Sequence, residues 1–206
     1  MARAERSALC DLALQLGEDH PTLCGAWTVK DLVVHLLVRE GNVAAAGIVV
    51  PQLARVTDLA SRRLARQEFP LLVERLRNGP PVYSPYRVPR LDRMFNTLEF
   101  FVHHEDVRRA RPEWRARPLA DRQQRTLWKM VGTAAKGLLR KADVGVVLER
   151  SDTGERVTPT RGDGEVVVRG LPGELVMFAF GREQAEVEYH GAPEHVATLK
   201  ATSLGV

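Results

Sequence analysis

Several features that would define a protein class are scarce in this chain. Of its 206 residues only 2 are cysteine and 6% are aromatic. Cys10 and Cys24 fit no Cys-x-x-Cys spacing, and two cysteines are too few for a disulfide framework. No apolar stretch approaches the roughly 20 residues that span a bilayer, and the first residues lack the apolar core and cleavage site of a signal peptide. We therefore expect a cytoplasmic protein without a membrane partner.

The basic residues are unevenly distributed along the chain. Residues 141–206 contain 7 Lys and Arg and 11 Asp and Glu, a net charge of −4, so the totals of 30 and 26 leave 23 and 15, a net charge of +8, for residues 1–140. This difference favours two domains and can steer anionic ligands toward the first. The arginines around 108–125 alternate with acidic residues and prolines and form no stripe interleaved with aromatic residues. We therefore predict no nucleic-acid partner.

Apolar residues recur at helical spacing through the first 140 residues. They predict helices over 2–17, from Val29 into the 40s, from about residue 56 to before Pro70, from Pro70 to 78, from 90 to 111 and from 120 to 141. Thr28 is a good N-cap for the second helix, with Asp31 at the position of a capping box. Residues 82–89 contain two prolines and predict a loop. Four or five such helices indicate an up-and-down bundle, an architecture that builds metal sites from facing helices.

The hydrophobic period changes after residue 141. Short β-rich segments at 144–148 and 165–168 are separated by the turn signals Asp152-Thr-Gly154 and Gly162-Asp-Gly164. A helix over 171–180, a strand over 185–189 and a helix from Pro193 to about 201 follow. This order is typical of a small α+β domain. We thus predict a mainly α protein with a helical bundle over 1–141 and a small α+β domain over 142–206.

Two segments place metal-ligand side chains on helix faces that are otherwise apolar. Glu99 and His103 are four residues apart, so they lie on the same side of a helix. His35 lies between two leucines on the inward face of the second helix. The three residues would make a two-His, one-carboxylate site, and three protein ligands leave a coordination position open, as in catalytic metal sites. Such a set accepts Zn²⁺, Fe²⁺ or Ni²⁺, and the sequence does not choose among them.

The neighbours of this set have alternative interpretations. Asp106 follows His103 by three residues, so it is either a hydrogen-bond acceptor for the His103 ring or a surface partner of a nearby arginine. We expect His104 and Glu105 to be solvated. Cys24 is either a reactive thiol or an ordinary small apolar residue, and the second is the more frequent role of a lone cysteine.

The segment Trp27-Thr-Val-Lys-Asp-Leu-Val-Val-His35-Leu resembles the Trp-(Ser/Thr)-x-x-(Asp/Glu)-x-x-x-His-(Leu/Val) signature of the mycothiol-dependent maleylpyruvate isomerase family. The family joins a DinB-like four-helix bundle to a small sterol-carrier-like domain, and its Gly-Arg near a helix end is similar to Gly181-Arg182. The run from Val102 to Arg109 resembles an actinobacterial branch more than the isomerase itself. The resemblance covers most of the chain. It implies a divalent metal, typically zinc, held by His35, Glu99 and His103.

The resemblance also implies a reaction. A mycothiol-like thiol would bind at the open metal position as a thiolate and attack a small electrophilic substrate, in an S-transferase or isomerase reaction. Arg182 is suited to a catalytic role in holding a substrate carboxylate, although it could instead form a surface ion pair with Glu183 or Glu186. The alternatives are a non-catalytic metal sensor or carrier and a structural bundle with a buried Glu99–arginine pair. The substrate, the metal in the cell and the choice between monomer and homodimer stay open.

Overall fold

The computed structural model describes residues 1–40, 54–79 and 91–205, and the chain divides into two compact units, Met1–Trp114 and Arg115–Val206. The loop predicted over 82–89 lies outside the described residues. No helix among the described residues is both long and apolar enough to cross a membrane.

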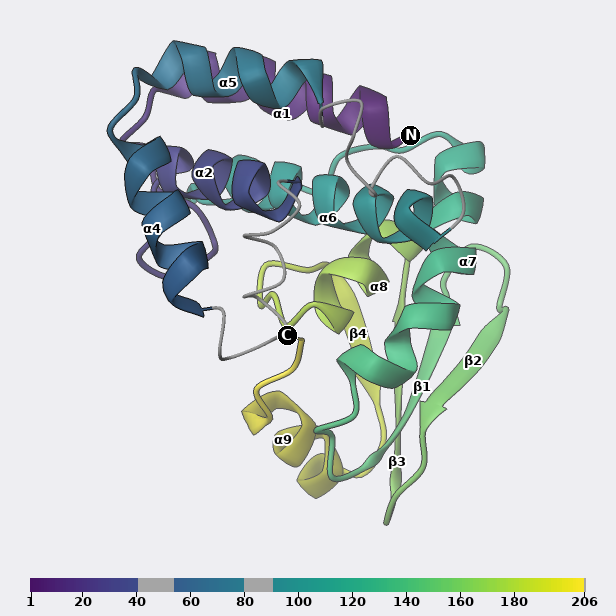
Figure 1. The fold of residues 1–206 in the computed structure, drawn as a ribbon. Helices are drawn as coiled ribbons and strands as arrows, with labels where there is room; N and C mark the ends of the chain where they lie inside the picture. Colours follow the sequence, from purple (N-terminus) through teal and green to yellow (C-terminus); the bar gives the residue numbers. More distant parts are fainter. Residues whose placement is uncertain (41–53, 80–90, 206) are drawn as a thin grey trace. The chain divides into compact units, whose positions relative to one another are not determined.

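The described part of the first unit is built from helices. Its described helices are α1 (Ala2–Leu16), α2 (Val29–Glu40), α4 (Ala54–Ala65), α5 (Phe69–Asn78) and α6 (Leu91–Arg108). α1 packs against α5 and α6, whereas α2 packs against α4 and α5. Figure 1 shows α5 running alongside α1. The predicted helical bundle is confirmed, with each helix boundary within a few residues of its expected place.

The start of α2 is set by a reciprocal cap, as the sequence predicts. The backbone N–H of Thr28 donates to the Asp31 carboxylate at 3.0 Å, and the Asp31 N–H donates to the Thr28 hydroxyl at 3.3 Å. The N–H of Val29 donates to the His20 carbonyl at 2.9 Å, and residues Pro21 and Thr28 form an isolated β-bridge. Satisfying these N–H groups fixes where the helix begins. This starting point determines on which side of α2 each of its residues lies.

The core of the first unit lies between these helices. Apolar side chains from α1, α2, α5 and α6 are fully buried there and form one cluster that includes Leu9, Leu32, Leu36, Leu72, Leu76 and Phe100. Burying a leucine or phenylalanine side chain stabilises the fold by about 1.5–3 kcal/mol relative to leaving it exposed. This packing sets the faces of α2 and α6 that carry the polar residues described below.

The second unit combines a helix, a sheet and two further helices. It begins with α7 (Asp121–Leu138), followed by β1 (Gly145–Arg150), β2 (Arg156–Thr160), β3 (Glu165–Gly170), α8 (Pro172–Ala179), β4 (Val187–His190) and α9 (Pro193–Ala201). The strand order is β2-β1-β3-β4. β1 pairs antiparallel with β2 and parallel with β3, whereas β3 pairs antiparallel with β4. The α+β character predicted for this part is confirmed.

The division between the units differs from the predicted boundary by one helix. The sequence places α7 in the bundle, with the boundary at 141/142, but the structure groups it with the second unit. α7 packs against α8 and β2, where Trp128 is buried and the Arg150 guanidinium lies 6.0 Å from the centre of its ring. Helical periodicity identifies an apolar face, but it does not say which partner that face meets.

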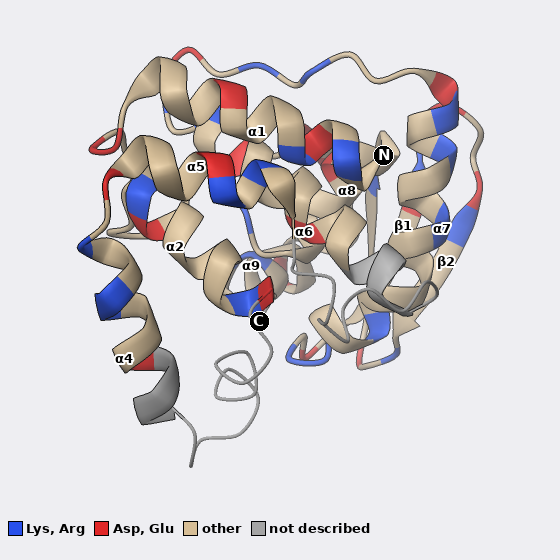
Figure 2. Cartoon of the chain, turned by 45° about the horizontal axis from the view of Figure 1, so that its top comes forward, with Lys and Arg blue, Asp and Glu red and all other residues tan. Residues whose placement is uncertain are grey.

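Acidic and basic residues are interspersed along α1 and α5, as Figure 2 shows. Arg77 of α5 contacts Asp11 of α1 at 2.8 Å, and Arg6 of α1 pairs with Glu40 of α2. The side chain of Arg6 also lies over the Phe100 ring, 4.5 Å from its centre. Some of the arginines of the first 140 residues are therefore paired with acidic residues within the helical unit.

Candidate metal centre

The structure brings together the three residues that the sequence singles out. His35 comes from α2, and Glu99 and His103 come from successive turns of α6. Each offers one ligand atom, and these atoms all lie within 4.8 Å of one another. The Nε2 atom of His103 is 3.3 Å from the Oε2 atom of Glu99, and the two imidazole rings meet edge to face with centroids 5.5 Å apart.

These separations suit a divalent ion. A tetrahedral ion bound at about 2.1 Å by nitrogen and oxygen keeps its ligand atoms about 3.4 Å apart. The His103–Glu99 distance of 3.3 Å already meets this value. His35 is held by contact with Trp27, whose ring centroid is 5.0 Å away. The donor set and its spacing therefore fit a metal, and three protein ligands leave room for another.

His35 is neutral and Glu99 is ionised, which are the protonation states that metal binding requires. Burial, followed by the charge of His103, lowers the pKa of His35 to about 4, so its imidazole is neutral at pH 7. Burial alone would raise the pKa of Glu99, but the hydrogen bond from His103 and the charge of Arg39 outweigh it and bring that pKa to about 2. One carboxylate and one neutral imidazole are thus ready to bind a cation.

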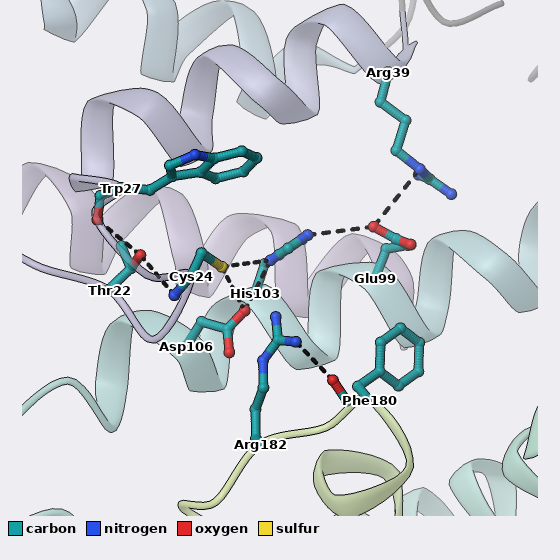
Figure 3. A network of polar contacts seen from close by, with 9 residues as sticks. All are labelled: Thr22, Cys24, Trp27, Arg39, Glu99, His103, Asp106, Phe180 and Arg182. Carbon is teal, nitrogen blue, oxygen red and sulfur yellow. Dashed lines mark hydrogen bonds and ion pairs between the residues drawn. The ribbon is translucent and has the colours of Figure 1, made fainter. Parts of the chain in front are cut away.

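Arg39 is a neighbour of this set that was not predicted to lie there. Its Nε atom lies 3.6 Å from the Glu99 carboxylate (Figure 3). Its Nη1 donates to the side-chain oxygen of Asn96 at 2.8 Å. Arg39 follows His35 by four residues on the same helix, so the sequence holds a signal for this proximity. The Glu99–arginine pair considered as an alternative therefore exists in the structure, with both side chains partly buried.

The other nitrogen of His103 faces a second group. Its Nδ1 atom is 3.0 Å from Oδ2 of Asp106 and 3.8 Å from Sγ of Cys24, and the Cys24 thiol donates to the same carboxylate oxygen at 3.1 Å (Figure 3). Asp106 is fully buried. Of its two predicted roles, the structure supports the acceptor for the His103 ring. Cys24 packs against the hydrophobic core, as expected for a small apolar residue, and its thiol also contacts the Asp106 carboxylate.

The hydrogen bonds to Asp106, Cys24 and Glu99 outweigh the burial of His103, which alone would lower its pKa, and hold that pKa well above its ordinary value. The metal-free protein therefore carries an imidazolium here, whose two N–H groups face one carboxylate each. Binding a metal at Nε2 requires this ring to lose one proton.

The prediction that His104 and Glu105 are solvated is wrong. They are only 5% and 0% exposed. His104 Nδ1 lies 2.8 Å from the Glu5 carboxylate of α1, because α1 packs along α6. Glu105 accepts hydrogen bonds from Arg108 and Arg109, each at 2.8 Å. These partners are far away in sequence or lie on the next helical turn, so counting charges alone does not reveal them.

Arg182, the residue expected to hold a substrate carboxylate, belongs to the second unit. It follows Gly181, whose φ of 77° and close approach to the Leu204 carbonyl leave no space for a Cβ atom. Its Nη1 donates to the Phe180 carbonyl at 2.7 Å. Together with Tyr189 and Lys200, Arg182 lines a cavity of about 570 Å³ in that unit.

Comparison with solved structures identifies proteins with the same fold. The chain is similar to the crystal structure of a mycothiol-dependent maleylpyruvate isomerase, with a TM-score of 0.56 and 19% identity over 91% of this chain and 89% of that one. A histidine-to-alanine mutant of that isomerase gives a TM-score of 0.61 and 18% identity over the same shares. The folds are the same. No protein-family model matches the sequence, and no curated protein matches it. The isomerase fold is therefore carried here by a sequence that is only 18–19% identical to that enzyme.

Proposed function

We propose that this chain is a metal-dependent enzyme that uses a low-molecular-weight, mycothiol-like thiol to attack small electrophilic substrates. The observation that carries the proposal is the convergence of His35, Glu99 and His103, whose ligand atoms lie within 4.8 Å of one another. Two imidazoles and one carboxylate leave a coordination position for a cosubstrate. The fold of a mycothiol-dependent isomerase supports the choice of thiol.

A divalent ion bound here, Zn²⁺ in the first instance and Fe²⁺ or Ni²⁺ by the same donor chemistry, supplies a Lewis acid that keeps a coordinated thiol deprotonated. The protein residues prepare that position. Glu99 contributes a negative charge, and His35 contributes a neutral nitrogen held against Trp27. Asp106 accepts the Nδ1–H of His103, which leaves the Nε2 lone pair for the metal.

The thiol sulfur then forms a bond to an electrophilic carbon of the substrate. In a transferase reaction a leaving group departs with the electron pair. In an isomerase reaction the sulfur adds to a double bond and leaves again after rotation about the resulting single bond. We assign to Arg182 the binding of a substrate carboxylate, because a guanidinium binds such a group with two parallel hydrogen bonds. Its place at a cavity of about 570 Å³ supports this role.

The contact between Arg39 and Glu99 favours a second candidate. At 3.6 Å the guanidinium can neutralise the carboxylate without any metal, which would make the centre a structural ion pair in a helical bundle. A metal sensor or carrier without turnover is the remaining alternative. Elemental analysis of the purified protein separates the structural candidate from the other two, since only that one predicts far less than one equivalent of metal.

The enzymatic proposal is tested by thiol consumption. Metal-loaded protein is incubated with a thiol and a panel of electrophiles, both double-bond acids and substrates with leaving groups, beside the variants His35→Ala and His190→Ala. His190 is exposed on β4, so its loss controls for removing a histidine. We expect turnover by the wild type and His190→Ala and a loss of turnover in His35→Ala. Equal rates in all three proteins would refute the proposal.

A further inference from the structure

His103 stands between two sets of metal-ligand atoms, one at each ring nitrogen. Its Nε2 faces Glu99 at 3.3 Å, on the side of His35. Its Nδ1 faces Asp106 at 3.0 Å and Cys24 at 3.8 Å. In the second set, as in the first, one ligand atom from each residue lies within 4.8 Å of the others. The proposed function uses Asp106 only as a hydrogen-bond acceptor for His103 and leaves the Cys24 thiol without a role.

The spacing of the second set is close to that of a coordination sphere. For a tetrahedral ion, ligand nitrogen and oxygen lie about 3.4 Å apart, and sulfur lies about 3.5 Å from either. The structure has 3.0 Å between Nδ1 and Oδ2, 3.8 Å between Nδ1 and Sγ, and 3.1 Å between Sγ and Oδ2. Shifts of a few tenths of an ångström in the three side chains would therefore admit an ion.

The position of Cys24 is fixed by its own loop. The backbone N–H of Cys24 donates to the Thr22 hydroxyl at 3.1 Å, and that hydroxyl donates to the Trp27 carbonyl at 2.9 Å (Figure 3). The neighbouring N–H of Leu23 donates to the Asp106 carbonyl at 3.1 Å, which fastens the loop to α6. The sulfur is thus held beside the carboxylate by backbone hydrogen bonds that do not involve its own side chain. This is how rigid metal sites are supported.

The donor atoms of the second set include a sulfur atom and therefore favour thiophilic ions. A thiolate and a carboxylate carry two negative charges, which match a dication, whereas the first set carries one and has Arg39 beside it. Sulfur favours thiophilic ions such as Cd²⁺ and Zn²⁺ over Mg²⁺ or Mn²⁺. The burial of Asp106 and His103, at 0% and 8% exposure, excludes much of the competing water.

We propose that Cys24, Asp106 and the Nδ1 atom of His103 form a second, alternative metal position for a thiophilic divalent ion. On binding, the Cys24 thiol and the Nδ1 atom release their protons to solvent. The proton that stays on the ring is then on Nε2, which donates to Glu99. The two carboxylates exchange roles: Asp106 becomes a ligand, and Glu99 becomes the hydrogen-bond acceptor. A neutral imidazole has one lone pair, so an ion in either position excludes an ion from the other.

The experiment titrates metal-free protein with Cd²⁺, in the absence of added thiol, and follows the ultraviolet charge-transfer absorption of a cadmium–thiolate bond. We expect this absorption to saturate at one equivalent in the wild type. Cys24→Ser should lose it. Cys10→Ser is the matched control, because Cys10 is buried with its thiol 3.7 Å from the Val73 carbonyl, outside both sets, and should keep it. His35→Ala should keep it as well, since that residue belongs only to the first set.

A second measurement uses the unaltered chain. Cd²⁺ should protect Cys24, located by mass spectrometry, from alkylation in the folded wild type. Charge-transfer absorption that persists in Cys24→Ser, that is lost in His35→Ala, or that is absent from the wild type together with a failure of protection would overturn the inference. Its failure is distinguishable from that of the proposed function, because His35→Ala addresses turnover and Cys24→Ser addresses the second position.

Discussion

Binding of a metal at the His35, Glu99 and His103 set should release one proton per ion at pH 7. In the metal-free protein the pKa of Glu99 is about 2 and that of His35 about 4, so neither has a proton to lose. The pKa of His103 is well above its ordinary value of 6.5, so this ring is protonated. Its Nδ1 proton stays with Asp106, and its Nε2 proton must leave for the metal to bind. His103 alone therefore determines the number of protons released per metal ion.

The affinity for metal follows from that count. The dissociation constant should fall about tenfold for each unit of rising pH below the pKa of His103, a change of about 1.4 kcal/mol per unit. The stability of the metal-free protein changes in the opposite direction. A raised histidine pKa stabilises the fold below the unfolded value of 6.5, and this contribution is lost as the pH rises through the folded value. As the pH rises above 6, the affinity for metal should thus increase, while the free energy of unfolding of the metal-free protein should decrease.

The assay is calorimetric titration with Ni²⁺ in buffers of different ionisation enthalpy, which gives the number of protons released. The Cys24→Ser protein is the appropriate background, because it removes the thiol that would contribute a proton of its own. His35→Ala should weaken binding without changing the count, whereas His103→Gln should weaken binding and bring the count to zero. A count near zero in the Cys24→Ser background, or an unchanged count in His103→Gln, would refute these protonation states.

Three other substitutions test the neighbouring structure. Asp106→Asn can donate to Nδ1 of His103 and so place the ring proton on Nε2; we expect roughly 10–100-fold weaker Ni²⁺ binding in competition with a chelator, and unchanged affinity would contradict the orienting role. Thr28→Ala removes the cap of α2 and should lower the free energy of unfolding by about 1 kcal/mol in urea. Glu5→Ala leaves the buried His104 without this partner and should cost roughly 1–3 kcal/mol, with Glu5→Gln as the milder control.

The helices and the proximity of Glu99 to His103 could be predicted from the sequence because they depend on local spacing. The capping box of Thr28 and Asp31 lies within one helical turn, and so does the pair Glu99 and His103. That these two meet His35 is a question of how two helices pack, and here the similarity of the Trp27 to His35 segment to a known family supplied what periodicity does not.

The surroundings of the site were less predictable. Cys24 reaches its partner Asp106 across 82 residues, through a loop whose path depends on backbone hydrogen bonds. His104 looks like a solvated residue in a charged run, yet α1 covers it, and the contact with Glu5 spans 99 residues. The grouping of α7 with the sheet depends likewise on which surface its apolar face meets. Single-sequence patterns report that a face is apolar or charged, and tertiary packing decides its neighbours.

The run from His103 to Asp106 occupies all sides of one helical turn. His103 and Asp106 contact Cys24, His104 contacts α1, and Glu105 contacts the arginines that follow it. An inserted or deleted residue between Glu99 and Arg109 would rotate everything beyond it by about 100° and break several of these contacts at once. Natural variation in this stretch should therefore consist of replacements at constant length. Gaps in aligned relatives should collect elsewhere, and a relative with a changed length here should have lost the ligands too.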